Sequence, residues 1–308
     1  IPESIFSGAE KLKTVNLTGC TGIKEIESSA FIGCEALISI DLSPCINLEK
    51  IDLMAFNECE KLESINLSGC SKLKEIGRCA FEKCGSLKNI DFSSCNELNK
   101  IDEMAFNACS NLKSINFTNC AKLDKIEWSV FSDCVNLESI NFTGCIGLEV
   151  IAYYAFRNCS TLKILDLSPC KNITKVLGFS ECTNLETLNL AGCAKLKEIS
   201  SFGYCKKLKN IDFSGCVELI NINGFHDCSS LAYVDLSSCV KMTEIHNNTF
   251  SGCTNAVIKL PYSIINIAYN AFGRDNDSYC KKVLVPNEEI KKLVHSAGFQ
   301  ENRIEIYQ

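Results

Sequence analysis

Residues 62–84 read LESINLSGCSKLKEIGRCAFEKC, with apolar residues spaced as LxxIxL at the start and an Ala-Phe pair followed by cysteine at the end. The next copy begins at Leu87 and keeps this pattern, with Phe92 in place of Leu67. One phenylalanine marks each unit and recurs first at steps of 25 residues and then at steps of 22 to 25. These are Phe6, Phe31, Phe56, Phe81, Phe106, Phe131, Phe156, Phe179, Phe202, Phe225, Phe250 and Phe272. Such self-similarity indicates a repeat architecture.

Each LxxIxL segment predicts a β-strand. The segment is too short for a helix, and its alternating apolar residues suit a strand with one buried face. A single unit buries little apolar surface, but stacked units bury a continuous core, with parallel strands about 4.8 Å apart. The leucines that open the units, the isoleucines of the Ile26 and Ile51 series, and the phenylalanines are then expected to form three ladders through this core.

The repeats also resemble a known family. AFNECEKLESINL (55–67) and AFEKCGSLKNIDF (80–92) are similar to leucine-rich repeats of the BspA-like type, found in bacterial surface proteins and some protozoan parasites. The resemblance covers nearly all 308 residues in about eleven repeats. It implies an α/β leucine-rich repeat solenoid, a right-handed coil with a parallel β-sheet on the concave face and short turns or 3-10 segments on the convex face. The cysteine three residues beyond most strands is also similar to cysteine-containing intracellular leucine-rich repeats.

The predicted solenoid occupies residues 1–272, and residues 273–308 are expected to cap its C-terminal end. In this capping segment, KKVLVP (281–286) predicts a last strand. Asn287 is a suitable N-cap for a helix that follows, because its side chain can accept a hydrogen bond from the first helical turn. RIEIY (303–307) then predicts a short final strand, which gives a strand–helix–strand ending similar to that of BspA-like chains.

Twenty of the 22 cysteines fall into two ladders, one just after and one just before each strand. Cys34 and Cys45 flank one strand and are separated by well over about 15 Å of extended chain, so the two ladders cannot cross-link. Within one ladder, in-register side chains point the same way, which fits the disulfide dihedral poorly. We therefore predict free, buried thiols that donate weakly to turn carbonyls. Cys79 lies outside the ladders, and because its equivalents Ser29 and Ser129 are polar we expect it to be reactive and partly exposed.

A row of polar residues runs along the outward side of the predicted strands. Its central position is Asn or Asp in ten successive repeats, and Ser or Thr follows two residues later in nine of them. One interpretation is a solvated face on which these side chains bond to each other; the other is a polar strip for a protein or glycan partner. Apolar or aromatic residues within this strip would be its anchors. The candidate partner-binding residues are Ile38, Asp41, Asn66, Asp91, Asn116, Asn141, Ile164, Asp166, Asp212, Tyr233 and Asp235.

Several functions find no support in the sequence. The net charge of −6 argues against a nucleic-acid partner, which favours a clustered basic face. No run of 18 apolar residues is present to cross a membrane. The three histidines lack a recognisable catalytic partner, and neither phosphate-binding glycine loops nor CxxC metal motifs occur. We therefore expect no enzyme activity, no cofactor and no metal, and a monomeric chain.

The family resemblance leads to two functional hypotheses. The first is a non-catalytic recognition or adhesion protein at a bacterial cell surface, or secreted, which binds a host matrix protein, a cell-surface protein or a glycan on the concave face. The second is an intracellular, cytoplasmic scaffold or substrate-recruiting arm, which the cysteine content favours because thiols stay reduced in the cytoplasm. The sequence begins in the middle of a repeat, at IPESIF (1–6), so we expect a signal or anchor segment to lie outside this chain.

Overall fold

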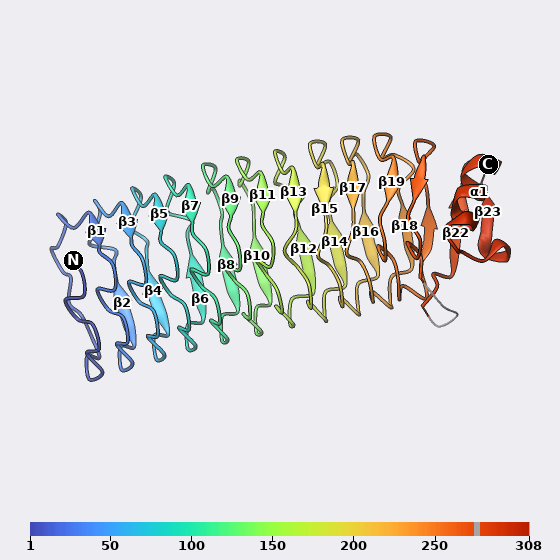
Figure 1. Ribbon diagram of the computed structural model, residues 1–308. Coiled ribbons are helices and arrows are strands. Elements are labelled where there is room, and N and C mark those ends of the chain that lie inside the picture. Colours follow the sequence, from blue (N-terminus) through green and yellow to red (C-terminus); the bar gives the residue numbers. More distant parts are fainter. Residues whose placement is uncertain (274–277, 308) are drawn as a thin grey trace. The chain divides into compact units, whose positions relative to one another are not determined.

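The computed structural model describes residues 1–273 and 278–307 (Figure 1). The chain divides into two compact units. Unit 1 comprises Ile1–Leu162 and unit 2 comprises Lys163–Gln308. Residues 274–277 and 308, which belong to the predicted capping segment, lie outside the described residues. The predicted boundary after residue 272 stays a prediction.

Unit 1 is a stack of solenoid turns, here called rungs, and each complete rung has two short strands (Figure 1). The three-residue strands form from LxxIxL, and the two-residue strands form at the isoleucine ladder. All strand pairs are parallel, with β2 beside β4 and with β6, β8 and β10 in order. The two-residue strands β1, β3, β5, β7, β9 and β11 pair in that order. The bounds are β1 Glu25–Ile26, β2 Ser39–Asp41, β3 Lys50–Ile51, β4 Ser64–Asn66, β5 Glu75–Ile76, β6 Asn89–Asp91, β7 Lys100–Ile101, β8 Ser114–Asn116, β9 Lys125–Ile126, β10 Ser139–Asn141 and β11 Val150–Ile151.

Unit 2 has the same construction, with rungs of 22 to 25 residues. Its three-residue strands and the C-terminal strands form one parallel sheet in the order β12, β14, β16, β18, β20, β22 and β23. The two-residue strands β13, β15 and β17 pair in order, and β19 pairs with β21. The bounds are β12 Ile164–Asp166, β13 Lys175–Val176, β14 Thr187–Asn189, β15 Glu198–Ile199, β16 Asn210–Asp212, β17 Asn221–Ile222, β18 Tyr233–Asp235, β19 Glu244–Ile245, β20 Val257–Lys259, β21 Asn266–Ile267, β22 Lys282–Val285 and β23 Ile304–Ile306.

The alternation of the sequence explains both sheets. In β2, Ile40 is buried, whereas Ser39 and Asp41 on either side are exposed. In β3, Ile51 is buried and Lys50 points outward. The sequence placed the isoleucine ladder in the core but did not predict that it forms a second sheet, because two residues are too few for a recognisable alternation. The predicted short turns are present, and the one 3-10 helix among the described residues is η1, Glu301–Arg303.

Stacked phenylalanine rings fill the interior of each unit. In unit 1, neighbouring rings from Phe6 to Phe156 lie nearly parallel, with centroids 4.9 to 5.3 Å apart. In unit 2 the rings from Phe179 to Phe272 stack at 5.1 to 6.2 Å. The rung spacing thus matches the distance at which offset aromatic rings attract each other. This confirms the predicted phenylalanine ladder within each unit.

Turns beside the phenylalanines require a left-handed backbone. Gly8 and Gly33 adopt positive φ there, and the same position in later rungs holds residues with side chains, such as Glu58 and Ala108 at φ 60° and 58°. Left-handed conformations cost an L-residue roughly 1–2 kcal/mol, so packing of the stacked rungs must impose them.

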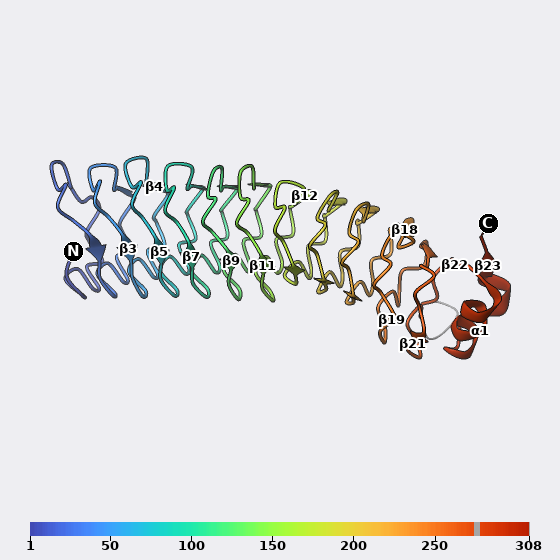
Figure 2. The ribbon, with the colours of Figure 1, turned by 90° about the horizontal axis from the view of Figure 1, so that it is seen from above.

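The C-terminal segment forms as the sequence predicted. β22 pairs with β20, and β23 pairs with β22. Helix α1, Glu288–Ser296, begins after Asn287, whose Oδ1 accepts a hydrogen bond of 2.9 Å from the Ile290 N–H. Figure 2 shows α1 beside β22 and β23, and its buried side chains are Ile290 and Val294. The helix thus covers apolar residues at the end of unit 2.

Candidate functional site

The face formed by the outward side chains of the three-residue strands, here called the strand face, carries the predicted polar row. In all ten rungs the Asn or Asp Oδ1 accepts a hydrogen bond of 2.8 to 3.1 Å from the backbone N–H two residues later. These are Asx turns, which end each strand. The residues are Asn16, Asp41, Asn66, Asp91, Asn116 and Asn141 in unit 1 and Asp166, Asn189, Asp212 and Asp235 in unit 2. One oxygen of each side chain therefore serves the fold, and only the other polar group is left for solvent or a partner.

Several of these side chains also bond to a neighbouring rung. In unit 1 Asn116 Nδ2 donates to Asp91 Oδ1 at 3.0 Å, and Asn141 Nδ2 donates to Thr118 Oγ1 at 2.9 Å. In unit 2 Asn189 donates to Asp166 in the same way at 3.0 Å. The bonds that the first interpretation expects between Asx side chains thus form between Asn116 and Asp91 and between Asn189 and Asp166, and the binding role of these residues stays a prediction.

The three apolar candidates are all exposed, but they occupy different places. Ile164 and Tyr233 are the first residues of β12 and β18 in unit 2, with 62% and 46% of their surface exposed. Ile38 in unit 1 is 45% exposed and precedes β2, so it belongs to the row of lysines and glutamates beside the strands.

One hollow of about 310 Å³ lies on the strand face of unit 2 and is called the Tyr233 hollow below. It brings together three of the predicted residues, Asp212, Tyr233 and Asp235. Its lining also includes Ser214, Gly215 and Ser237, which follow β16 and β18. Tyr233 pairs in register with Asn210, so the hollow spans two adjacent rungs.

Hydrogen bonds fix the polar groups on one side of this hollow. The Tyr233 hydroxyl donates to Asp235 Oδ2 at 3.3 Å, and the Ser237 hydroxyl donates to Asp235 Oδ1 at 2.5 Å. Partial burial works to raise the pKa of Asp235, but the Ser237 hydrogen bonds and the charge of Lys259 outweigh it and lower this pKa. Partial burial and the nearby Asp235 carboxylate raise the pKa of Tyr233, so its phenol stays protonated and remains a donor.

The sequence did not single out two residues beside the hollow. Lys259 Nζ lies 3.3 Å from Asp235 Oδ2 and 4.8 Å from the centre of the Tyr307 ring. The Tyr307 hydroxyl donates to the Leu260 carbonyl at 2.9 Å, which holds this ring in place. Lys259 stands one rung after Asp235, where earlier rungs have Asn or Asp, so this break in the pattern was the available signal. Nothing in the sequence connects Tyr307 to this position, 47 residues from its hydrogen-bond acceptor.

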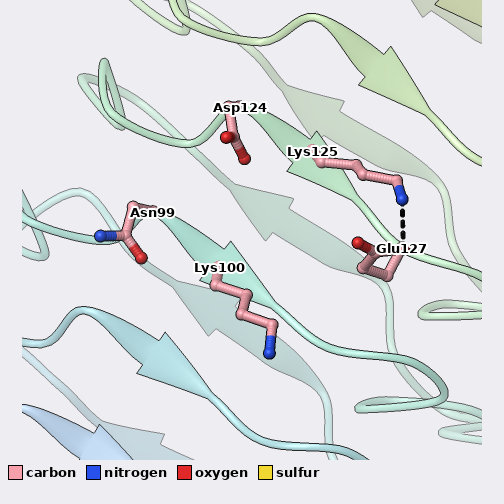
Figure 3. A pocket seen from close by; sticks show the side chains of 5 residues that line it. All are labelled: Asn99, Lys100, Asp124, Lys125 and Glu127. Carbon is pink, nitrogen blue, oxygen red and sulfur yellow. Dashed lines mark ion pairs between the residues drawn. The ribbon is translucent and has the colours of Figure 1, made fainter.

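A second hollow, of about 410 Å³, lies on the side of the two-residue strands in unit 1 (Figure 3). Asn99, Lys100, Asp124, Lys125 and Glu127 line it. Lys125 Nζ pairs with Glu127 at 2.7 Å, and Lys100 pairs with Asp102 and Glu75 at 2.8 and 3.3 Å. Both lysine charges are thus already compensated, and we do not place a ligand here.

The cysteine ladders are buried, as predicted. Of the 22 cysteines, 21 are buried and Cys20 is of intermediate exposure. Most ladder thiols donate to carbonyls of the preceding rung, for example Cys84 Sγ to Phe56 at 3.2 Å and Cys216 Sγ to Leu190 at 3.6 Å. The described part of the chain contains no group of three or more residues arranged to hold a metal ion.

The expectation for Cys79 was wrong. Its surface is only 4% exposed, and the equivalent Ser129 is also buried, with 6% of its surface exposed. Burial is the main reason that the pKa of Cys79 is raised to about 11. A protonated, buried thiol is a poor nucleophile, so the structure gives no support for a reactive cysteine.

The stacked parallel rungs, with their regular apolar ladders and outward polar row, define a leucine-rich repeat solenoid of about eleven turns. More specifically, the chain belongs to the BspA-type leucine-rich repeat family. The family model, described as a BspA type leucine rich repeat region of six copies, matches residues 1–97, 24–163, 74–200 and 151–278. The comparison with curated proteins gave no match. No helix among the described residues has the length and apolar character of a membrane span.

Solved structures of bacterial leucine-rich repeat proteins are similar to this chain. A leucine-rich repeat protein from Bacteroides ovatus ATCC 8483 is 23% identical over 100% of this chain and 87% of that chain, with a TM-score of 0.49. A leucine rich cell surface protein from Faecalibacterium prausnitzii A2-165 is 19% identical over 92% of this chain and 86% of that chain, with a TM-score of 0.40. The functional domain of InlJ from Listeria monocytogenes, which includes a cysteine ladder, is 15% identical over 96% of this chain and 73% of that chain, with a TM-score of 0.36.

Proposed function

We propose that this chain is a non-catalytic recognition protein that binds a protein partner through its strand face at a bacterial cell surface. The observation that carries this proposal is the placement of exposed apolar residues among rigid polar ones. Ile164 and Tyr233 stand on strands whose ends are fixed by Asx turns, so a partner would meet them without a large ordering cost. Exposed aromatic and aliphatic residues within a polar surround are typical of the energetic centres of protein interfaces.

Membership of the BspA-type family supports the location at the cell surface. The charge of the face favours a protein partner over a glycan. Three of the four Asx-row residues in unit 2 are aspartates, whereas unit 1 has two among six. A neutral glycan gains little from such charge, but a protein with basic side chains gains both affinity and a faster encounter.

The proposal is tested in two steps. An antibody raised against this chain should label intact source cells; labelling only after permeabilisation would contradict the surface location. Beads coated with the chain should then bind one or more purified extracellular-matrix or cell-surface proteins from a defined panel. Replacing Ile164 and Tyr233 by aspartate should weaken that binding about tenfold or more, because both anchors would become charged.

A matched control distinguishes loss of binding at the strand face from unfolding of the chain. Val217 and Val240 are exposed apolar residues of the same unit, but they lie in the turns that follow the strands. Their double replacement by aspartate should leave both binding and the circular dichroism spectrum unchanged. Equal loss in both double variants, or no loss in either, would place the binding site away from the strand face.

A further inference from the structure

The two carboxylates of the Tyr233 hollow differ in how their charges are balanced. Asp235 Oδ2 lies 3.3 Å from Lys259 Nζ and accepts from the Tyr233 hydroxyl, so its charge is already compensated. Asp212 accepts a 2.8 Å hydrogen bond from the Ser214 N–H through Oδ1. Among the residues that the structure describes, no cation forms an ion pair with Asp212. Its second oxygen and most of its charge are therefore left for a ligand.

The shape of the hollow favours a flat group. The Tyr233 ring is about half exposed and lines the hollow together with Asp212, while Gly215 adds no side chain there. A planar guanidinium can stack on an aromatic ring and donate two parallel hydrogen bonds to one carboxylate. An ammonium group provides the charge without the plane, and a saccharide can provide stacking without the charge.

The adjacent rung already holds a cation in a comparable setting. Lys259 Nζ lies between the Asp235 carboxylate and the face of the Tyr307 ring, 4.8 Å from the ring centre. This part of the strand face thus combines a carboxylate and a tyrosine ring around a basic group within the chain itself. At Asp212 and Tyr233 the same two components are present without the basic group.

We propose that the Tyr233 hollow binds the guanidinium of an arginine side chain presented by the partner protein. Asp212 would accept hydrogen bonds from the N–H groups of the guanidinium, and the Tyr233 ring would lie against the guanidinium plane. Asp235, which is paired with Lys259, would line the hollow beside them. This proposal rests on the function proposed above and adds the chemistry of the group that is recognised.

The test uses a small probe with one guanidinium. N-acetyl-arginine amide is titrated into the isotope-labelled full chain, and amide chemical shifts are followed by NMR. We expect saturable shifts at residues 212–215 and 233–238. N-acetyl-citrulline amide has the same shape without the charge and should not saturate, and methyl glucoside should not bind. Equal affinity for either of these compounds would overturn the proposal.

Substitutions by residues that occupy the same position in other rungs test the role of each side chain. Asp212→Asn should weaken the arginine probe at least about fivefold while keeping the Asx turn, because Asn189 makes the same turn one rung earlier. Tyr233→Ser should also weaken it, since Ser39 and Ser64 occupy this strand position in unit 1, whereas Tyr233→Phe should retain the ring and most of the affinity.

Asp227→Asn is the control for charge. It removes a carboxylate from the same unit but outside the hollow, at a left-handed position that Asn158 occupies in unit 1, and should leave probe binding unchanged. Equal affinity in Asp212→Asn and the original chain would overturn the guanidinium site. If the probe fails to bind while the Ile164 and Tyr233 double variant loses its protein partner, this inference fails and the proposed function stands.

Discussion

The same row of residues serves different purposes in the two units. In unit 1 the Asx row is mostly asparagine, and the amides of Asn116 and Asn141 donate hydrogen bonds to the neighbouring rung. In unit 2 the row is mostly aspartate, and Asp212 and Asp235 border a hollow with an exposed tyrosine. In both units Oδ1 accepts the same kind of hydrogen bond from the backbone N–H two residues later. The turn depends on Oδ1, which Asn and Asp share. The groups that the side chain can bind depend on its second polar atom, which is an amide nitrogen in Asn and a carboxylate oxygen in Asp.

The largest expected effect concerns what the units share, their buried thiols. Burial is the main reason that the pKa of Cys70 and Cys145 in unit 1, and of Cys216 and Cys239 in unit 2, is raised to about 12. An unfolded thiol ionises near pH 8.5, so above that pH the folded state holds protons that the unfolded state has lost. The contribution of these thiols to the free energy of unfolding should therefore be fully present below about pH 8.5. Above that pH, the free energy of unfolding should fall by about 1.4 kcal/mol per pH unit for each such thiol.

Urea unfolding followed by circular dichroism, in the presence of a reductant at pH 7, 9 and 10, measures this loss. Replacing Cys193, Cys216 and Cys239 by alanine provides the comparison, because the variant has three fewer thiols to ionise on unfolding. It should lose less stability per pH unit than the original chain, although it starts lower. Equal slopes would show that the thiols are not the cause.

A smaller effect should separate the two roles of the Asx row. Asn66→Ala in unit 1 and Asp212→Ala in unit 2 each remove one hydrogen bond to the backbone and should each cost about 1 kcal/mol in the free energy of unfolding. Asn66→Asp and Asp212→Asn keep that bond and should change stability much less. Thermal or urea unfolding of the four variants gives the answer, and an alanine variant as stable as its parent would contradict the structural role.

The smallest effect concerns the left-handed turns. Ala108 has φ 58° at a position where Gly8 and Gly33 stand in the first rungs, so Ala108→Gly should stabilise the chain by about 0.5–1 kcal/mol. Ala121→Gly is the matched change at an exposed alanine outside the left-handed region, and it should cost stability because glycine gains more freedom on unfolding. A stability change of the same sign in both variants would contradict the strain argument.

Much of the fold could be predicted because the same pattern of core residues recurs in every repeat. The LxxIxL alternation, the phenylalanine spacing and the Asn287 cap all act locally, and each led to the element that the structure contains. The second sheet was missed because a two-residue strand such as Lys50–Ile51 is too short to show an alternating pattern. It is recognised as a strand only by its pairing with the strands of adjacent rungs. Cys79 was misjudged because the polar side chains at equivalent positions were taken as a sign of exposure, although Ser129 is itself only 6% exposed.

The candidate site was predictable only in part. Alternation alone placed Asp212, Tyr233 and Asp235 on the outward side of their strands. The sequence could not show that Lys259 neutralises one carboxylate and leaves the other free, because this depends on side-chain distances. Nor could it bring Tyr307 to Lys259, since that contact forms only once β23 has paired with β22.

The Asx turns also have an evolutionary consequence. Codons for asparagine and aspartate differ by a single base, as do codons for serine and tyrosine. A gene that encodes such rungs can therefore add or remove a charge, or an aromatic ring, in one mutational step while every strand end keeps its hydrogen bond. A lineage can explore new partners along this face without passing through an unstable ancestor.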